Sequence, residues 1–155
     1  MKSIKESQYL DTKIVTICTD RVFEIKTLDN ENIFKLYDFE KFNDDSSVKF
    51  KLLCRSNYLE IRNRIFYAES WSFNNFIHNF KKMYNELSGK ASLESSEDGI
   101  IEIIVTKLGR IIIHCDINIY ADPVQHCDLE FDVDQSYLIN MVNEIDLIYE
   151  ELEII

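Results

Sequence analysis

The stretch DLEFDVDQSYLINMV, residues 128–142, changes its periodicity partway along. From Asp128 to Val133 acidic and apolar residues alternate, which is typical of a strand with one buried face. After Asp134 the apolar residues recur at helical spacing instead. The stretch therefore predicts a β-strand that leads directly into an amphipathic α-helix, with Asp134 as the residue that caps the helix N-terminus.

The segment RIIIHCDINIY, residues 110–120, has the same two-residue period and precedes a turn that contains Pro123. Because a period of two places alternate side chains on one face, the two segments predict a hairpin with apolar residues inward and acidic residues outward. With the turn centred on Asp122, alignment of the apolar faces predicts these opposing pairs: Asp116 with Asp128, His114 with Glu130, and Asn118 with His126.

The outward-facing side chains of this hairpin form a candidate binding surface for a protein partner. Two directly opposed carboxylates repel each other, and a sheet does not need them for its stability. An acidic patch therefore indicates a positively charged partner, and its predicted members are Asp116, Asp128, Glu130, Asp132 and His114. The alternative is an ordinary solvated face with a shifted strand register.

The remaining sequence predicts an α+β fold. Segments rich in Ile, Val, Phe and Tyr predict further strands over residues 12–18, 21–28, 33–39, 48–54, 58–67, 91–95 and 100–107. In the segment 58–67, alternation predicts an apolar face formed by Leu59, Ile61, Ile65 and Tyr67. Short reversals and the order strands, helix, strands, helix indicate an antiparallel, mostly meandering β-sheet of about eight or nine strands. Residues 1–155 are expected to form one domain, since the chain has an ordinary domain length and few Gly or Pro residues.

Two amphipathic α-helices are predicted, over about residues 72–88 and 135–152. Ser72 is the expected N-cap of the first helix, and Trp71 before it is expected to pack on Phe76. Gly89 is expected to end this helix, because glycine adopts the left-handed conformation readily.

The charge balance constrains the possible partners. Lys and Arg number 17 against 28 Asp and Glu, which gives a net charge of −11. Such a surface repels nucleic acids and anionic membranes, so neither is an expected partner, and a basic protein is favoured. The N-terminal segment lacks the apolar run of a secretion signal, and the four widely spaced cysteines are expected to be reduced thiols. A cytoplasmic protein is therefore predicted.

The sequence does not predict an enzyme, a metal site or a bound cofactor. The acidic run lacks the glycine and the final glutamate of a calcium-binding loop, whose positions hold Val133 and Ile139. His114 and Cys115 are adjacent in a strand and point to opposite faces, which disfavours a shared zinc ion and a Cys–His catalytic pair. A metal-dependent hydrolase built on the acidic run is an alternative that metal analysis of the purified protein would test.

Several segments occur in an order that is similar to a known family. They are LSGKASLES at 87–95, DGIIEIIV at 98–105, GRI at 109–111 and LEFDVDQSYL at 129–138. From Tyr58 onward the chain resembles the WapI-like immunity proteins, whose acid-Gln-Ser/Thr-Tyr-Leu signature is similar to the last of these segments. Arg110 departs from the histidine that is more usual after the glycine, so the resemblance assigns this position no role.

This resemblance implies a non-catalytic bacterial immunity protein that binds and neutralises a cognate secreted polymorphic toxin. Several toxins of this class are nucleases with basic active sites, and an acidic protein can occupy such a site by imitating the charge of nucleic acid. The alternative functions are a general protein-binding module and a homo-oligomeric domain that uses exposed residues such as Tyr58, Tyr120 and Ile112.

Overall fold

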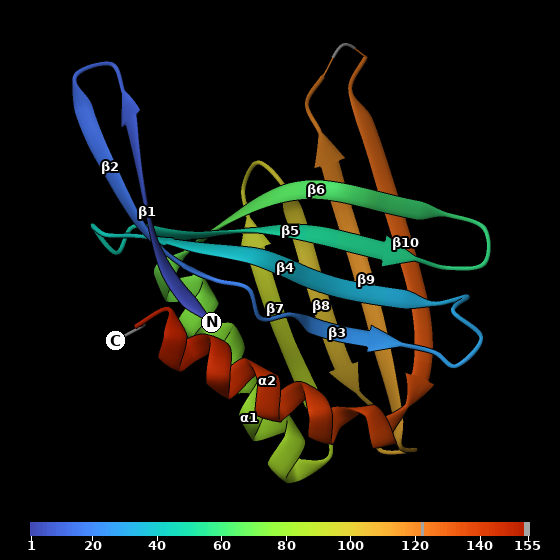
Figure 1. The fold of residues 1–155 in the computed structure, drawn as a ribbon. Coiled ribbons are helices and arrows are strands. Elements are labelled where there is room, and N and C mark those ends of the chain that lie inside the picture. The colour runs from blue at the N-terminus through green and yellow to red at the C-terminus, as the bar shows by residue number, and fades with distance from the viewer. Residues whose placement is uncertain (122, 154–155) are drawn as a thin grey trace.

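The computed structural model describes residues 1–121 and 123–153, which form an α+β fold with two antiparallel β-sheets (Figure 1). The predicted fold class is confirmed, although the strands divide between two sheets. The first sheet contains β1 (Lys2–Tyr9), β2 (Thr12–Thr19), β3 (Phe23–Lys26), β4 (Ile33–Phe42), β5 (Ser47–Arg55) and β6 (Glu60–Glu69). The second sheet contains β7 (Gly89–Ser95), β8 (Gly99–Val105), β9 (Arg110–Ile119) and β10 (Gln125–Asp134). The helical elements are α1 (Ser70–Glu86), the 3-10 turn η1 (Gln135–Tyr137) and α2 (Leu138–Glu151).

Both sheets are largely meanders. The first has the order β1-β2-β4-β5-β6, with β3 also paired to β4, and the second has the order β10-β9-β8-β7. The strands of the second sheet run across those of the first, and the two helices lie next to each other at one side of the sheets (Figure 1). α1 packs against β7 and α2 packs against β3, so the helix pair connects the two sheets. Neither helix in the described part of the chain is long and apolar enough to cross a membrane.

The inner faces of both sheets and both helices enclose a cluster of buried apolar side chains. Phenylalanine rings fill much of it. The ring centroid of Phe50 in β5 lies 5.2 Å from that of Phe66 and 5.6 Å from that of Phe39. Phe23 in β3 meets Phe80 of α1 edge to face, with 5.3 Å between centroids. Because offset and edge-to-face pairs are favoured by the ring quadrupoles, these contacts help to fix α1 and β3 against the sheet.

The N-terminus of α1 differs from the prediction. The helix begins at Ser70, and the preceding Glu69 makes no side-chain capping bond. Ser72, the predicted cap, is buried within the first turn, where its Oγ accepts a hydrogen bond from the backbone N–H of Glu94 at 3.4 Å. Trp71 is 61% exposed, so most of its ring is not covered as the predicted packing requires. The cap prediction is wrong because β6 continues into α1 without a loop, so the strand sets where the helix starts.

Two other capping predictions had opposite outcomes. At the end of α1, Leu87 has a φ of 54° and takes the left-handed position predicted for Gly89, which instead begins β7. Asp134 is confirmed as a cap, since its carboxylate accepts a hydrogen bond from the backbone N–H of Ser136 at 2.8 Å. It caps η1, which leads directly into α2.

β6 contains a β-bulge that reverses the alternation of its side chains. Asn63 has a φ of 53°, and the register between β5 and β6 shifts across this region. Ile61 faces the core before the bulge and Phe66 faces it afterwards, whereas Tyr67 is 46% exposed. The predicted apolar face that joined Ile61 to Tyr67 is therefore wrong, because the extra residue changes the parity of the strand.

β1 and β2 form a hairpin that extends away from the rest of the chain (Figure 1). All the residues of β1 are exposed, including Ile4 and Tyr9. β1 was not among the predicted strands, because a strand without a buried face carries no apolar alternation.

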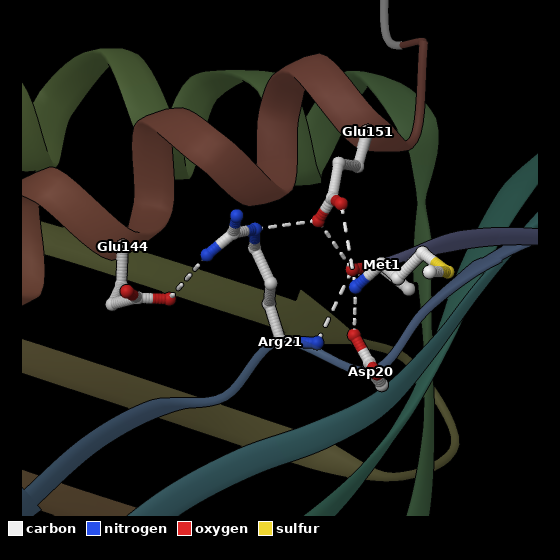
Figure 2. A network of polar contacts seen from close by, with 6 residues as sticks. Met1, Asp20, Arg21, Glu144 and Glu151 are labelled. Atoms are coloured by element: carbon white, nitrogen blue, oxygen red, sulfur yellow. Dashed lines mark hydrogen bonds and ion pairs between the residues drawn. The ribbon is translucent and has the colours of Figure 1, made fainter.

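A polar network connects the segment between β2 and β3 to α2 (Figure 2). Arg21 forms ion pairs with Glu151, at 2.6 Å, and with Glu144, at 3.6 Å. The α-amino group of Met1 contacts Asp20 and Glu151. Since an acidic residue at a helix C-terminus opposes the helix dipole, these cations compensate the unfavourable position of Glu151.

Candidate functional site

β9 and β10 place the predicted binding residues on the outer face of the second sheet. The hairpin has the predicted register, which gives these opposing pairs: Asp116 with Asp128, His114 with Glu130, and Asn118 with His126. Most of the alternating residues of the inner face, among them Cys115 and Leu129, are buried. The predicted centre of the turn, Asp122, lies outside the described residues.

Each of the two opposed carboxylates is bound by a histidine of the neighbouring strand. Nε2 of His114 lies 2.7 Å from Oδ1 of Asp128, and its Nδ1 lies 3.2 Å from Oε1 of Glu102 in β8. Nε2 of His126 contacts Oδ1 of Asp116 in the same diagonal manner. These contacts offset the repulsion between Asp116 and Asp128, so the register is compatible with a stable sheet.

The surroundings of His114 favour its protonated form. Burial lowers the pKa of His114, but the hydrogen bonds to Asp128 and Glu102 outweigh this effect and raise the pKa above its usual value. A protonated imidazole donates from both ring nitrogens, which matches the carboxylate on each side of the ring. In its protonated form, His114 is a cation that joins three strands of the acidic face.

Basic side chains offset another part of the negative charge. Nε of Arg110 lies 2.9 Å from Oδ2 of Asp132, and Nζ of Lys90 lies 3.2 Å from Oε2 of Glu102. Glu130 is exposed and forms no ion pair with any residue that the structure describes. The predicted residues thus lie on one face, where Glu130 is the acid with the least compensated charge.

Cys115 and Cys127 lie on the other side of the second sheet from His114 and His126. Cys115 is buried and Cys127 is half-buried, and all four cysteines are free. The contact with Cys54 and then burial raise the pKa of the Cys115 thiol well above its ordinary range, so this thiol stays protonated and is a poor nucleophile. Within the described part of the chain, three or more His, Cys, Asp or Glu side chains nowhere gather in a way that could hold a metal ion.

Sequence reasoning missed a cleft where the two sheets meet. It has a volume of about 720 Å³, and its lining includes Tyr67, Glu69, Trp71, Glu94, Glu97 and Asp116. Nη2 of Arg64 in β6 donates to Oδ1 of Asp98, in the turn after β7, at 2.9 Å and thereby joins the two walls. The one sequence feature that could have indicated this cleft is Trp71, a large aromatic residue just outside the apolar stripe of α1. From the sequence alone, Trp71 was expected to pack on the helix.

Comparison with known protein families gives a match over most of the chain. The family model described as the immunity protein WapI-like family matches residues 19–153. The matched region includes β9, β10 and both helices, and it leaves out β1 and nearly all of β2. No match was found among curated proteins or among solved structures.

Proposed function

Because the chain belongs to the WapI-like immunity protein family, we propose that it binds and neutralises a cognate secreted bacterial toxin without catalysing a reaction. Membership of this family, which confirms the resemblance found in the sequence, implies a protein toxin as the partner. The family match over most of the chain is the observation that carries the proposal. In this function the protein acts in the cytoplasm of the cell that it protects.

The proposed contact surface is the outer face of β9 and β10. Its members are Asp116, Asp128, Glu130, Asp132 and His114. With a net charge of −11, the protein would attract a basic toxin domain, for example a nuclease that binds phosphate. Such attraction can raise the association rate by about 10- to 1,000-fold, and the uncompensated carboxylate of Glu130 would contribute to it.

Co-expression with the cognate toxin tests the function. Induction of the toxin alone should arrest growth, and induction of both proteins should restore it. A catalytically inactive toxin that still binds the purified protein would show that neutralisation works by stoichiometric binding. Continued growth arrest with both proteins folded and present in equal amounts would contradict the proposal.

Charge reversal tests the surface separately. The triple variant Asp116→Lys, Asp128→Lys and Glu130→Lys should associate with the toxin more slowly at low salt, and its rate should depend less on salt concentration. A matched control reverses three exposed acids away from this face: Glu31, Glu86 and Glu150. Equal slowing in both variants would mean that net charge alone matters and would reject this surface.

A homo-oligomer is a second candidate, because large aromatic side chains outside the core are exposed. Tyr58 is 93% exposed and Tyr120 is 66% exposed, whereas Ile112 is half-buried. Sedimentation of the purified protein across a range of concentrations would separate the two functions. A monomer at all concentrations would leave toxin binding as the function of this surface.

A further inference from the structure

The cleft between the two sheets combines exposed aromatic rings with carboxylates. Trp71 at the start of α1 is 61% exposed and Tyr67 at the end of β6 is 46% exposed, and both line the cleft. The carboxylates along it belong to Glu69, Glu94, Glu97, Asp98 and Asp116, and no Lys, Arg or His lines it in the described part of the chain. Large exposed aromatic residues are typical of the residues that dominate binding energy in protein interfaces.

Several of these carboxylates already form hydrogen bonds or ion pairs with other residues of the protein. Asp98 is bound by Arg64, by the backbone N–H of Tyr67 and by Ser95, and it holds the walls of the cleft together. Asp116 contacts His126 on the outer face of the sheet. Glu94 and Glu97 are exposed, and their carboxylates have no ion pair with any described residue.

The residues that line the cleft favour a cationic ligand. An anionic or strongly apolar ligand would be opposed by the carboxylates, whereas a guanidinium group can stack on an indole ring and also pair with carboxylates. The indole N–H of Trp71 contacts the carboxylate of Glu69, which holds the ring at the cleft. Asp116 lines the cleft and also belongs to the acidic face, so the two surfaces are continuous.

We infer that this cleft receives an arginine side chain of the protein partner, with Trp71 as the stacking surface and Glu94 and Glu97 as the counter-charges. The inference rests on the proposed binding function and adds an anchoring subsite to the acidic face. In this arrangement the face of β9 and β10 attracts the partner, and the cleft holds one of its side chains.

Trp71 is the single tryptophan of the chain, so its fluorescence reports on this cleft alone. The probe is a blocked tri-arginine peptide, with a blocked tri-citrulline peptide as the uncharged control of nearly equal shape. We expect a saturable change in Trp71 fluorescence with tri-arginine and none with tri-citrulline. No saturable change with tri-arginine would overturn the inference.

Two variants with equal change in net charge locate the binding. Glu94→Gln with Glu97→Gln should weaken tri-arginine binding by about tenfold, because two counter-charges are lost. Asp128→Asn with Glu130→Gln removes the same charge outside the cleft and should change binding by less than about twofold. Equal weakening in the two double variants would overturn the cleft as the site.

The role of the ring is tested by Trp71→Ala, with binding measured by calorimetry. We expect Trp71→Ala to weaken binding of tri-arginine by about five- to tenfold, and Tyr58→Ala, an exposed aromatic residue away from the cleft, to leave it unchanged. Unchanged binding in Trp71→Ala would reject the stacking role. This result can be distinguished from that of the growth assay. If peptide binding is lost while growth rescue is intact, only the proposed role of the cleft is overturned. If rescue fails while peptide binding is intact, only the proposed immunity function is overturned.

Discussion

Arg64 in β6 and Asp98 in the turn between β7 and β8 form an ion pair across the junction of the two sheets, with 2.9 Å between Nη2 and Oδ1. Oδ2 of Asp98 accepts the backbone N–H of Tyr67 at 2.9 Å, and the Asp98 side chain is only 9% exposed. A carboxylate this deeply buried needs its cation, because water cannot replace it. The pair therefore fixes how the second sheet meets the first at the cleft.

Removal of the cation should destabilise the protein. We expect Arg64→Ala to lower the free energy of unfolding by about 2–4 kcal/mol, because Asp98 would keep a buried charge without a counter-ion. Arg62→Ala is the matched control, since Arg62 lies in the same strand, is 69% exposed and, among the described residues, pairs only with Glu60. Urea denaturation measures both variants. Equal loss of stability in the two would show that the Arg64–Asp98 pair has no special structural role.

Gly99 should be intolerant of any side chain. A Cβ atom at this position would lie 2.1 Å from the backbone oxygen of Asp116, and its φ is +120°. Gly89 has nearly the same φ, +121°, but the nearest atom to its Cβ position is 4.0 Å away. We expect Gly89→Ala to cost about 1 kcal/mol and Gly99→Ala to cost at least about 2 kcal/mol more, because only the latter also forces β8 away from β9. Thermal unfolding of the two variants gives this difference, and similar melting temperatures would contradict it.

The β9–β10 hairpin was predictable from sequence because its side chains encode the pairing. Apolar alternation on both strands requires Cys115 and Leu129 to share the core face, and a turn centred on residue 122 then leaves one register. The stripe of α1 was predictable for the same reason, since every third or fourth residue from Phe73 onward is apolar and buried. Hydrophobic periodicity can be read from a short segment of sequence, and these elements have the structure that it predicts.

Other features depend on contacts between distant residues. The bulge at Asn63 inverts the faces of β6 without any change in the local composition. Ser72 is a residue type that commonly caps helices, but its hydroxyl accepts a hydrogen bond from the backbone N–H of Glu94 in β7, a strand of the second sheet. The cleft at Trp71 was missed because its walls come from the β6–α1 junction and from the β7–β8 turn, and only the tertiary fold brings them together.

The core and the projecting hairpin should differ in their contribution to stability. Phe50→Ala removes a fully buried ring that contacts the rings of Phe39, Phe66 and Phe73, and we expect it to cost about 3–5 kcal/mol. Ile4→Ala in β1, where the side chain is 66% exposed, should change the free energy of unfolding by less than about 0.5 kcal/mol. Chemical denaturation gives both values. A large loss in Ile4→Ala would indicate that β1 is packed in solution against a surface such as a second copy of the chain.

The His114 cluster should make stability depend on pH in a specific direction. Contacts with Asp128 and Glu102 raise the pKa of His114 in the folded protein above its value in the unfolded chain, despite the opposing effect of burial. Protonation therefore stabilises the fold fully below the unfolded pKa of about 6.5, and this contribution is lost as pH rises through the folded pKa. His114→Gln, which keeps a polar side chain but cannot take up the proton, should lose more stability relative to wild type at about pH 5.5 than at about pH 8.5.

His78→Gln provides the control for this pH dependence, because His78 is exposed on α1 and has no ion pair with any described residue. Urea denaturation of the wild type and both variants at the two pH values gives the required differences in unfolding free energy. The gap between wild type and His114→Gln should narrow as pH rises, whereas the gap for His78→Gln should stay small throughout. A gap for His114→Gln that is constant or widens with pH would mean that Asp128 and Glu102 do not hold a protonated His114 in the folded state.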